Sequence, residues 1–289
     1  MILLRMFAES GRLGLAALSL SGLWLAASPA SAEAVAKVPG AEVELLAGAV
    51  SGAQAEAGIE VRLAPGWKTY WRYPGDSGVP PDLSFEGSQN VAGVTIAWPA
   101  PKRFADGGGG FSIGYKGAVL FPLKVELADP AKPARLQLAF DFAVCEALCM
   151  PAKVDLSLAI DAGGGADAAR GVDAARIAAA RTALPAPQAL GAAETPTVRS
   201  VALDTTATPH RLVVEVKAMN PKADLFAEGP DAHWALPLPQ KTALPDGAAR
   251  FMVPLEGVPS GVDPTGALIT FTLVDGPKSV TTTVPVPAP

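Results

Sequence analysis

The sequence is poor in the residues that most often carry chemistry. Its 289 residues include two cysteines, two histidines and 6% aromatic residues. The two cysteines can form one intrachain bridge at most. His210 and His233 lie 23 positions apart without the spacing of metal ligands, so we interpret both as exposed or hydrogen-bonded side chains. We expect no metal ion and no organic cofactor.

Long apolar runs are also missing beyond the N-terminus. After residue 32 no stretch is apolar for long enough to cross a bilayer. The net charge is −5 and there is no basic run, which makes nucleic acid a poor partner. We therefore expect a mature chain without a membrane span that binds no nucleic acid.

The first 32 residues have the pattern of a secretory signal peptide. A basic start is followed by the apolar stretch Leu13–Ala27 and by the small residues Ala30 and Ala32. We predict cleavage after Ala32 and export to the periplasm. The alternative, an uncleaved membrane anchor, is disfavoured because the apolar run is short for a span. Export would place the two cysteines where disulfides persist.

Turn residues and alternating apolar residues are what the sequence has in quantity. It contains 29 glycines and 28 prolines, which suits an all-β protein with many turns. In several segments apolar and polar residues alternate, and this period of two indicates strands with one buried face. These segments are 59–63, 119–127, 135–142 and 153–160 in the first half, and 212–217, 251–255, 269–273 and 280–286 in the second.

The segments divide the chain into two β domains. We expect residues 38–161 to form a β-sandwich and residues 195–289 a second, smaller one. Between them, residues 162–194 are predicted to hold a flexible glycine break, a helix over Ala166–Leu184 and a proline-rich linker. The helix is either a rigid spacer or docked on a neighbouring sheet.

The two cysteines, Cys145 and Cys149, lie between two predicted strands, at the mouth of a β-hairpin. On a straight strand their Cα atoms would be about 13 Å apart. A disulfide needs a separation of about 4.4–6.8 Å. Residues 146–148 must therefore turn if the bridge forms.

The residues alone leave three interpretations of this pair open. The first is a structural bridge, although closing so short a loop stabilises a fold only weakly. The second is a redox disulfide that exchanges with partner thiols. The third is a Cu(I) site made of two thiolates and the Met150 thioether. The pair does not look like an activated nucleophile, because it opens no helix, has no histidine nearby in the sequence and has Glu146 beside it.

Four ordered segments of the first domain carry a family resemblance. They are Gly66–Gly78 (GWKTYWRYPGDSG), Trp98–Phe104 (WPAPKRF), Gly114–Gly117 (GYKG) leading to Phe121–Leu123 (FPL), and Val144–Pro151 (VCEALCMP). In these segments residues 38–161 resemble the N-terminal periplasmic domain of the thiol:disulfide interchange reductase DsbD, particularly its copper-sensitivity-suppressor branch, ScsB. The resemblance implies an immunoglobulin-like sandwich.

The resemblance also implies roles for particular residues. Cys145 and Cys149 would be the exchange pair, accepting electrons from a membrane thiol reductase of the DsbD or CcdA kind and passing them to periplasmic thioredoxin-fold proteins. A loop that caps the disulfide would span Ala105–Ile113, and the glycines at 107–110 would let it move. The side chains expected around the pair are Phe104 or Phe111 as the shielding ring and Tyr70, Trp71 and Tyr115 as the lining.

The chain departs from this family in two respects. The best-known members separate their cysteines more widely. The chain also carries neither the membrane domain nor the thioredoxin-like domain of the family, so we expect its electrons to come from a separate protein. The prediction is thus a periplasmic thiol–disulfide exchange protein. The alternative is a non-enzymatic binding protein of the envelope with a fixed structural disulfide.

Overall fold

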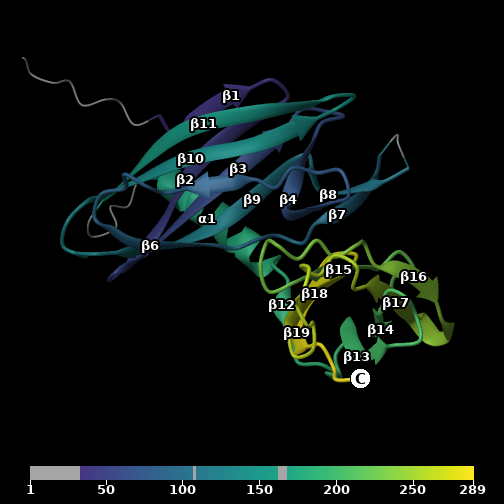
Figure 1. Cartoon of the computed structure of the whole chain (residues 1–289). Coiled ribbons are helices and arrows are strands. Elements are labelled where there is room, and N and C mark those ends of the chain that lie inside the picture. The colour runs from purple at the N-terminus through teal and green to yellow at the C-terminus, as the bar shows by residue number, and fades with distance from the viewer. Residues whose placement is uncertain (1–32, 107–108, 162–167) are drawn as a thin grey trace, which may run out of the picture. The chain divides into compact units, whose positions relative to one another are not determined.

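The structure is a computed structural model that describes residues 33–106, 109–161 and 168–289 (Figure 1). The predicted signal peptide and the glycine break at 163–165 lie outside the described residues. Residues Ala32–Pro289 form a single compact unit. Within the described ranges, no helix is both long enough and apolar enough to span a membrane.

The alternating segments of the first half form two sheets, which together we call the N-terminal sandwich. Its first sheet has the order β1 (Val35–Val38), β2 (Ala41–Ser51), β3 (Gln54–Leu63), β9 (Ala118–Leu127) and β6 (Val91–Ile96). Its second sheet has the order β11 (Cys149–Ile160), β10 (Ala134–Cys145), β4 (Lys68–Gly75), β8 (Phe111–Lys116) and β7 (Lys102–Ala105), with β5 (Asp82–Ser84) paired to β10. All neighbouring strands in both sheets are antiparallel.

The core of the N-terminal sandwich lies between these two sheets. Leu123 and Val125 of β9 and Leu136 and Leu138 of β10 are at most 1% exposed, and they belong to one apolar cluster. Burying a side chain of this size contributes about 1.5–3 kcal/mol. The residues between them in sequence are polar or less buried, as the period of two predicts. The predicted all-β sandwich is confirmed.

The helix α1 (Ala168–Thr182) falls within the range predicted for it and docks on the first sheet. Ile177 is fully buried, and a Cβ atom at Gly58 of β3 would lie 3.2 Å from its Cγ1. The missing side chain of Gly58 therefore makes room for the helix. An ion pair joins Arg176 of α1 to Glu60 of β3. Of the two alternatives for this helix, the docked one is correct.

The second half forms a smaller pair of sheets, which we call the C-terminal sandwich. One sheet has the order β12 (Ala186–Pro187), β19 (Lys278–Pro285), β18 (Leu268–Asp275) and β15 (Asp224–Glu228). The other has the order β13 (Thr197–Asp204), β14 (Arg211–Lys217), β17 (Ala248–Pro254) and β16 (Gln240–Ala243), with the 3-10 helix η1 (Pro245–Gly247) before β17. Val214, Phe251 and Phe271 are fully buried between the sheets.

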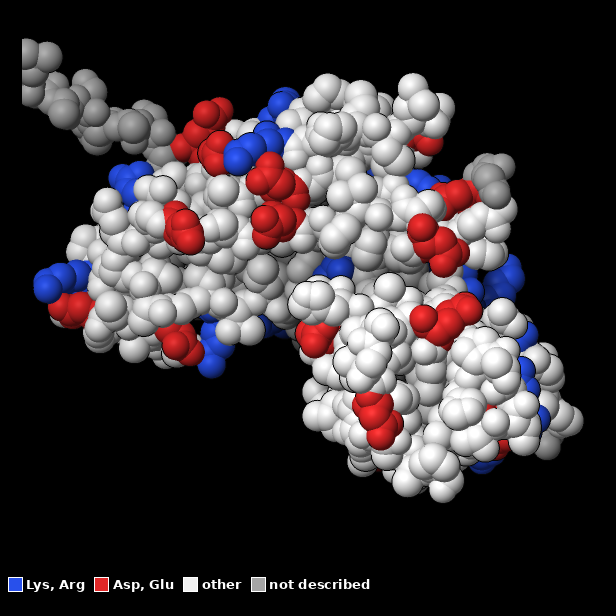
Figure 2. All heavy atoms as spheres, in the orientation of Figure 1, with Lys and Arg blue, Asp and Glu red and all other residues white. Residues whose placement is uncertain are grey.

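Charged side chains are interspersed over the face of the molecule that Figure 2 shows, within a larger uncharged area. Ion pairs also join neighbouring strands of the first sheet: Arg62 of β3 bonds Glu42 of β2 at 2.8 Å and Glu44 of β2 at 2.6 Å.

Candidate functional site: a disulfide at the tip of a hairpin

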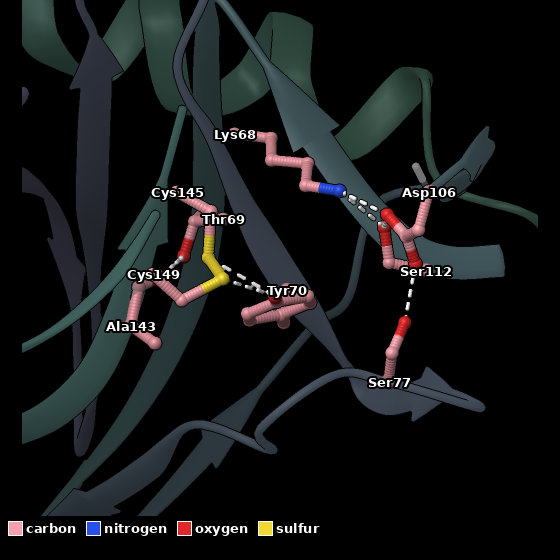
Figure 3. Close-up of a disulfide and its surroundings, with 9 residues drawn as sticks. All are labelled: Lys68, Thr69, Tyr70, Ser77, Asp106, Ser112, Ala143, Cys145 and Cys149. Atoms are coloured by element: carbon pink, nitrogen blue, oxygen red, sulfur yellow. Dashed lines mark hydrogen bonds and ion pairs between the residues drawn. A yellow bond between two sulfur atoms is a disulfide. The ribbon is translucent and has the colours of Figure 1, made fainter. Parts of the chain in front are cut away.

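The two cysteines are joined at the tip of the β10–β11 hairpin (Figure 3). Twelve residue pairs hold this hairpin in register, and the last of them is Cys145 opposite Cys149. The two Cα atoms are 4.1 Å apart. The turn expected between the cysteines is present, and the Glu146 N–H donates to the Leu148 carbonyl at 3.2 Å.

The two cysteines differ in exposure because their strands differ in position. β10 lies inside the sheet, where Cys145 pairs on its other side with Lys68 of β4, and Cys145 is 1% exposed. β11 is the edge strand of the sheet, and Cys149 is exposed. Leu148, next to it in the turn, is 80% exposed. Of the two cysteines, Cys149 is therefore the one that is open to solvent.

The hydroxyl of Tyr70 contacts both sulfur atoms. Its oxygen lies 3.0 Å from Cys145 Sγ and 3.1 Å from Cys149 Sγ, and the residue is 3% exposed. Burial, helped by the negative charge of Asp106, raises the pKa of Tyr70 above its ordinary value. The phenol thus keeps its proton at neutral pH and can donate a hydrogen bond to sulfur.

The alternation of β4 explains why Tyr70 is in this place. Lys68 is the register partner of Cys145, so Lys68 and Tyr70 point to the face that carries the disulfide. Thr69, between them, points the other way, and its hydroxyl donates to the Ala143 carbonyl at 2.9 Å. β4 and β8 approach closely here, since a Cβ atom at Gly114 would lie 1.9 Å from the Thr69 carbonyl oxygen. Only glycine fits at that position.

Four polar side chains, which we call the Lys68 network, lie on the other side of Tyr70 from the sulfurs (Figure 3). Lys68 Nζ is 2.5 Å from Asp106 Oδ1 and 2.8 Å from Ser112 Oγ, and the Ser77 hydroxyl donates to the other Asp106 oxygen. Burial alone would raise the pKa of Asp106. The hydrogen bonds from Lys68 and Ser77 outweigh it, and the pKa lies below its usual 3.8. The Asp106 carboxylate is therefore charged at neutral pH.

The loop expected to cap the disulfide is shorter than the sequence suggested. Ala105 ends β7 and Phe111–Ile113 belong to β8, so the connection between these strands is 106–110. Positions 107 and 108 lie outside the described residues. The turn closes with a hydrogen bond from the Asp106 N–H to the Gly110 carbonyl at 2.9 Å. Through Asp106, this turn is attached to the Lys68 network.

The two candidates for the shielding ring lie on opposite faces of the β7–β8 hairpin. Phe104 is the register partner of Ser112, which places it on the face of the Lys68 network. It is half-buried, and the Lys116 ammonium lies 4.7 Å from its ring centre. Phe111 points to the other face, where the Arg103 guanidinium lies 5.6 Å from its ring centre. Of the two, Phe104 is on the disulfide side, and shielding by its ring stays a prediction.

The three residues expected to line the site also separate by face. Tyr70 reaches the sulfurs. Trp71 and Tyr115 are 1% and 6% exposed in the core of the sandwich. The Tyr115 hydroxyl donates to the Pro99 carbonyl at 2.9 Å, and burial raises its pKa well above the ordinary value. Trp71 and Tyr115 thus pack in the core, on the face of the sheet opposite to the disulfide.

Sequence reasoning missed Lys68, Ser77, Asp106 and Ser112. The sequence did contain a signal for Lys68: it is two positions from Tyr70, and residues at this spacing share a face of a strand. The contacts of Ser77 and Asp106 depend on how two separate turns meet. The sequence has no local pattern that shows such a meeting.

Met150 does not lie with the two sulfurs. It is the register partner of Val144, which is 1% exposed, and it packs against the core. Its thioether is therefore on the opposite face of the hairpin from the disulfide. Within the residues described here, no three or more His, Cys, Asp or Glu side chains are grouped to hold a metal ion. The arrangement disfavours the Cu(I) interpretation.

Comparison with known proteins gives a family match for the N-terminal sandwich and a similar fold for most of the chain. Residues 39–160 match the family described as "Thiol:disulfide interchange protein DsbD, N-terminal". Among solved structures, the crystal structure of the N-terminal periplasmic domain of ScsB from Proteus mirabilis is similar in fold, with a TM-score of 0.67 and 23% identity, covering 88% of this chain and 98% of that chain. No curated protein matches the chain significantly. The similar fold therefore extends well beyond the segment that the family covers.

Proposed function

We propose that this chain relays electrons by thiol–disulfide exchange at Cys145 and Cys149, because residues 39–160 match the DsbD N-terminal family. The exchange takes place in the periplasm. The donor is a separate membrane thiol reductase of the DsbD or CcdA kind, and the clients are periplasmic thioredoxin-fold proteins. The observation that carries the proposal is an exposed Cys149 bonded to a buried Cys145, with the Tyr70 hydroxyl in contact with both sulfurs.

The exchange follows from this asymmetry. A thiolate of the reduced donor attacks Cys149 Sγ, the disulfide breaks, and Cys145 leaves as a thiolate that accepts a hydrogen bond from Tyr70. A second thiolate of the donor then attacks the donor sulfur of the mixed disulfide and releases Cys149. The donor leaves with a disulfide, and the pair has gained two electrons and takes up two protons. The reverse steps reduce a client.

The hairpin also argues against a purely structural bridge. Closing a turn of three residues removes little chain entropy, because the benefit of a cross-link grows with loop length. The register is already held by the other pairs of β10 and β11. The bridge therefore has little to add to the stability of the fold. Its position at an exposed tip suits a bond that is broken and formed again.

The test uses single-cysteine variants of the mature chain. Each is mixed with a thioredoxin-fold oxidoreductase that keeps only its nucleophilic cysteine, activated as a mixed disulfide with thionitrobenzoate. Cys145→Ser keeps the exposed sulfur and is expected to form a stable intermolecular disulfide, visible on a non-reducing gel. Cys149→Ser keeps only the buried sulfur and is the matched control, which should react far more slowly.

Two results would contradict the proposal. One is equal reactivity of the two variants, because the burial difference would then have no consequence for exchange. The other is a reduction potential below about −300 mV together with unfolding of both variants, which is the behaviour of a structural bridge. That outcome would favour the envelope binding protein with a fixed disulfide.

A further inference from the structure

A cleft with a volume of about 560 Å³ lies where the C-terminal sandwich meets the N-terminal sandwich. Residues 101–103, at the start of β7, form one wall. Residues between 220 and 226, which lead into and begin β15, form the other. Sites that enclose small molecules usually have volumes of about 300–1,000 Å³. The cleft is therefore large enough for a small ligand.

Two contacts fix the walls of the cleft relative to each other. Asp224 of β15 accepts two hydrogen bonds from Arg103 of β7, at 3.0 and 2.9 Å. Such a two-pronged pair fixes orientation as well as distance. Phe226, on the same face of β15, is 1% exposed, and its ring lies edge to face on the Trp71 ring with the ring centres 5.8 Å apart. The cleft is therefore formed before any ligand arrives, as most small-molecule sites are.

Hydrogen bonds also hold the segment that carries Lys222. The N–H groups of Met219 and Asn220 donate to the Asp275 carboxylate, both at 2.8 Å. The Lys222 N–H donates to the side-chain oxygen of Asn220, also at 2.8 Å. Asn220 lines the cleft, and with its oxygen engaged in this way it has two amide N–H donors to offer.

Positive charge exceeds negative charge along the cleft. Lys102 and Lys222 are exposed in its lining, and neither ammonium is paired with a carboxylate within the part of the chain that the structure describes. Asp224, the carboxylate in the lining, is neutralised by Arg103. The excess is notable in a chain whose net charge is −5. An anion in the cleft would therefore meet two uncompensated positive charges.

We propose that this cleft binds a small molecule that carries at least two carboxylate or phosphate groups. One anionic group pairs with Lys102 and another with Lys222, so that the ligand spans the two sandwiches. The Asn220 amide donates to the group at Lys222. A ligand with a single charge engages only one wall and binds more weakly. The C-terminal sandwich thereby has a role apart from the exchange at Cys145 and Cys149.

Isothermal titration calorimetry on the mature chain tests this, with citrate and inorganic pyrophosphate as probes at pH 7 and low salt. We expect one saturable site with a dissociation constant on the order of 1 mM or tighter, which a few hydrogen bonds to charged groups can supply. The probe that binds more tightly shows whether carboxylate or phosphate oxygens are preferred. Acetate, with one charge, should bind at least about tenfold more weakly. Added sodium chloride should weaken the binding of both probes by screening.

Lys102→Gln and Lys222→Gln test the location of the site. Each removes one ammonium group from an exposed position, so the fold should persist, and circular dichroism verifies this. Each should weaken binding of the preferred probe about tenfold or more. Lys222→Arg keeps the charge and should keep most of the affinity. The matched control is Lys217→Gln, at an exposed position of β14 outside the cleft, which should bind like the wild type.

The proposal is overturned if the folded wild-type chain gives no saturable binding of either probe. It is also overturned if both glutamine variants bind as the wild type does, because the anion then binds elsewhere. Neither result bears on thiol–disulfide exchange, since the titration involves no thiol. A chain that binds citrate in the cleft but exchanges with no thioredoxin-fold protein would support the anion site and refute the relay.

Discussion

The two sandwiches are built by the same rule and differ in what they place on their outer faces. In both, strands of alternating residues bury one face between two sheets. On β14 of the C-terminal sandwich, the residues between the buried ones include Glu215, which pairs with Arg250 across the sheet. On β4 of the N-terminal sandwich, the residues that point away from the core between the two sheets are Lys68 and the buried Tyr70, which lie beside a disulfide. The comparison shows that the fold supplies the platform and a few outward side chains supply the chemistry.

The comparison predicts first that stability and reactivity can be changed separately. Phe251 is fully buried in the core of the C-terminal sandwich, and none of the contacts of the disulfide involves it. Phe251→Ala should lower the free energy of unfolding by about 3–5 kcal/mol, because it leaves a cavity. Urea unfolding followed by circular dichroism measures this loss. Met219→Ala, at a position 78% exposed, is the control and should change little. A faster reduction of folded Phe251→Ala would show that the core of the C-terminal sandwich influences the disulfide.

The second prediction concerns the Tyr70 hydroxyl of the N-terminal sandwich, which contacts both sulfur atoms of the disulfide. Tyr70→Phe should slow reduction by dithiothreitol about tenfold, because a hydrogen bond to a charged group contributes about 1.5 kcal/mol or more. The control is Tyr115→Phe, which loses a hydroxyl in the same sandwich that bonds the Pro99 carbonyl and does not contact sulfur. Equal rates for Tyr70→Phe and wild type would remove Tyr70 from the mechanism.

The third prediction separates small reagents from protein partners. Leu148 is 80% exposed beside Cys149, so we expect a partner to cover it during exchange. Leu148→Ser should lower kcat/KM with a thioredoxin-fold partner about fivefold. Partial burial of the leucine side chain against a partner contributes about 1 kcal/mol of binding free energy, which corresponds to this loss. The rate with dithiothreitol should not change. Val262→Ser, at a position 45% exposed in the C-terminal sandwich, is the control. A similar loss with both reagents would point to a distorted hairpin instead.

The smallest expected effect is the pH dependence of the Lys68 network. The pKa of Asp106 in the folded chain is below the 3.8 of the unfolded chain, so its contribution to stability is present above that pH. It is lost as the pH falls below 3.8 towards the folded value. Asp106→Asn should therefore melt below the wild type at pH 7, and the gap should close in acid. The melting temperatures of both proteins between pH 7 and pH 2.5 provide the measurement.

Asp204 gives the corresponding control in the C-terminal sandwich. Hydrogen bonds from Thr206 and Arg211 lower its pKa to about 2, so Asp204→Asn should also lose its stability difference in acid. It should not change the rate of disulfide reduction, whereas Asp106→Asn should, since Asp106 pairs with Lys68, the register partner of Cys145. A rate change in both variants would mean that the effect is general to the fold.

Sequence alone predicted the architecture because burial in these sheets repeats every second residue. The strand over 135–142 and the hairpin turn at 146–148 could be placed from alternation and from the cysteine spacing. Whether α1 docks on a sheet could not be decided from the sequence. The docking depends on the absence of a side chain at Gly58 and on the ion pair with Glu60, and both residues lie more than a hundred positions before the helix. The sequence shows each residue but not their proximity.

The candidate site was predictable in part for the same reason. Cys145, Cys149 and Tyr70 were named from the sequence, and the structure brings their reactive atoms within 3.1 Å. Trp71 and Phe111 were named beside them, but strand alternation turns both to the opposite face. Asp106 was not named, because its contact with Lys68 joins segments 38 positions apart.

The register of the β10–β11 hairpin has a consequence for what a change of redox state looks like. Eleven pairs besides the cysteine pair fix the backbone of this hairpin, so breaking the covalent link leaves both strands where they are. The oxidised and reduced molecules should then have nearly the same shape, and a partner would tell them apart only by touching the tip. Under the proposed exchange, the two electrons gained on reduction reside in two thiols at the hairpin tip, and the rest of the fold should not change with them.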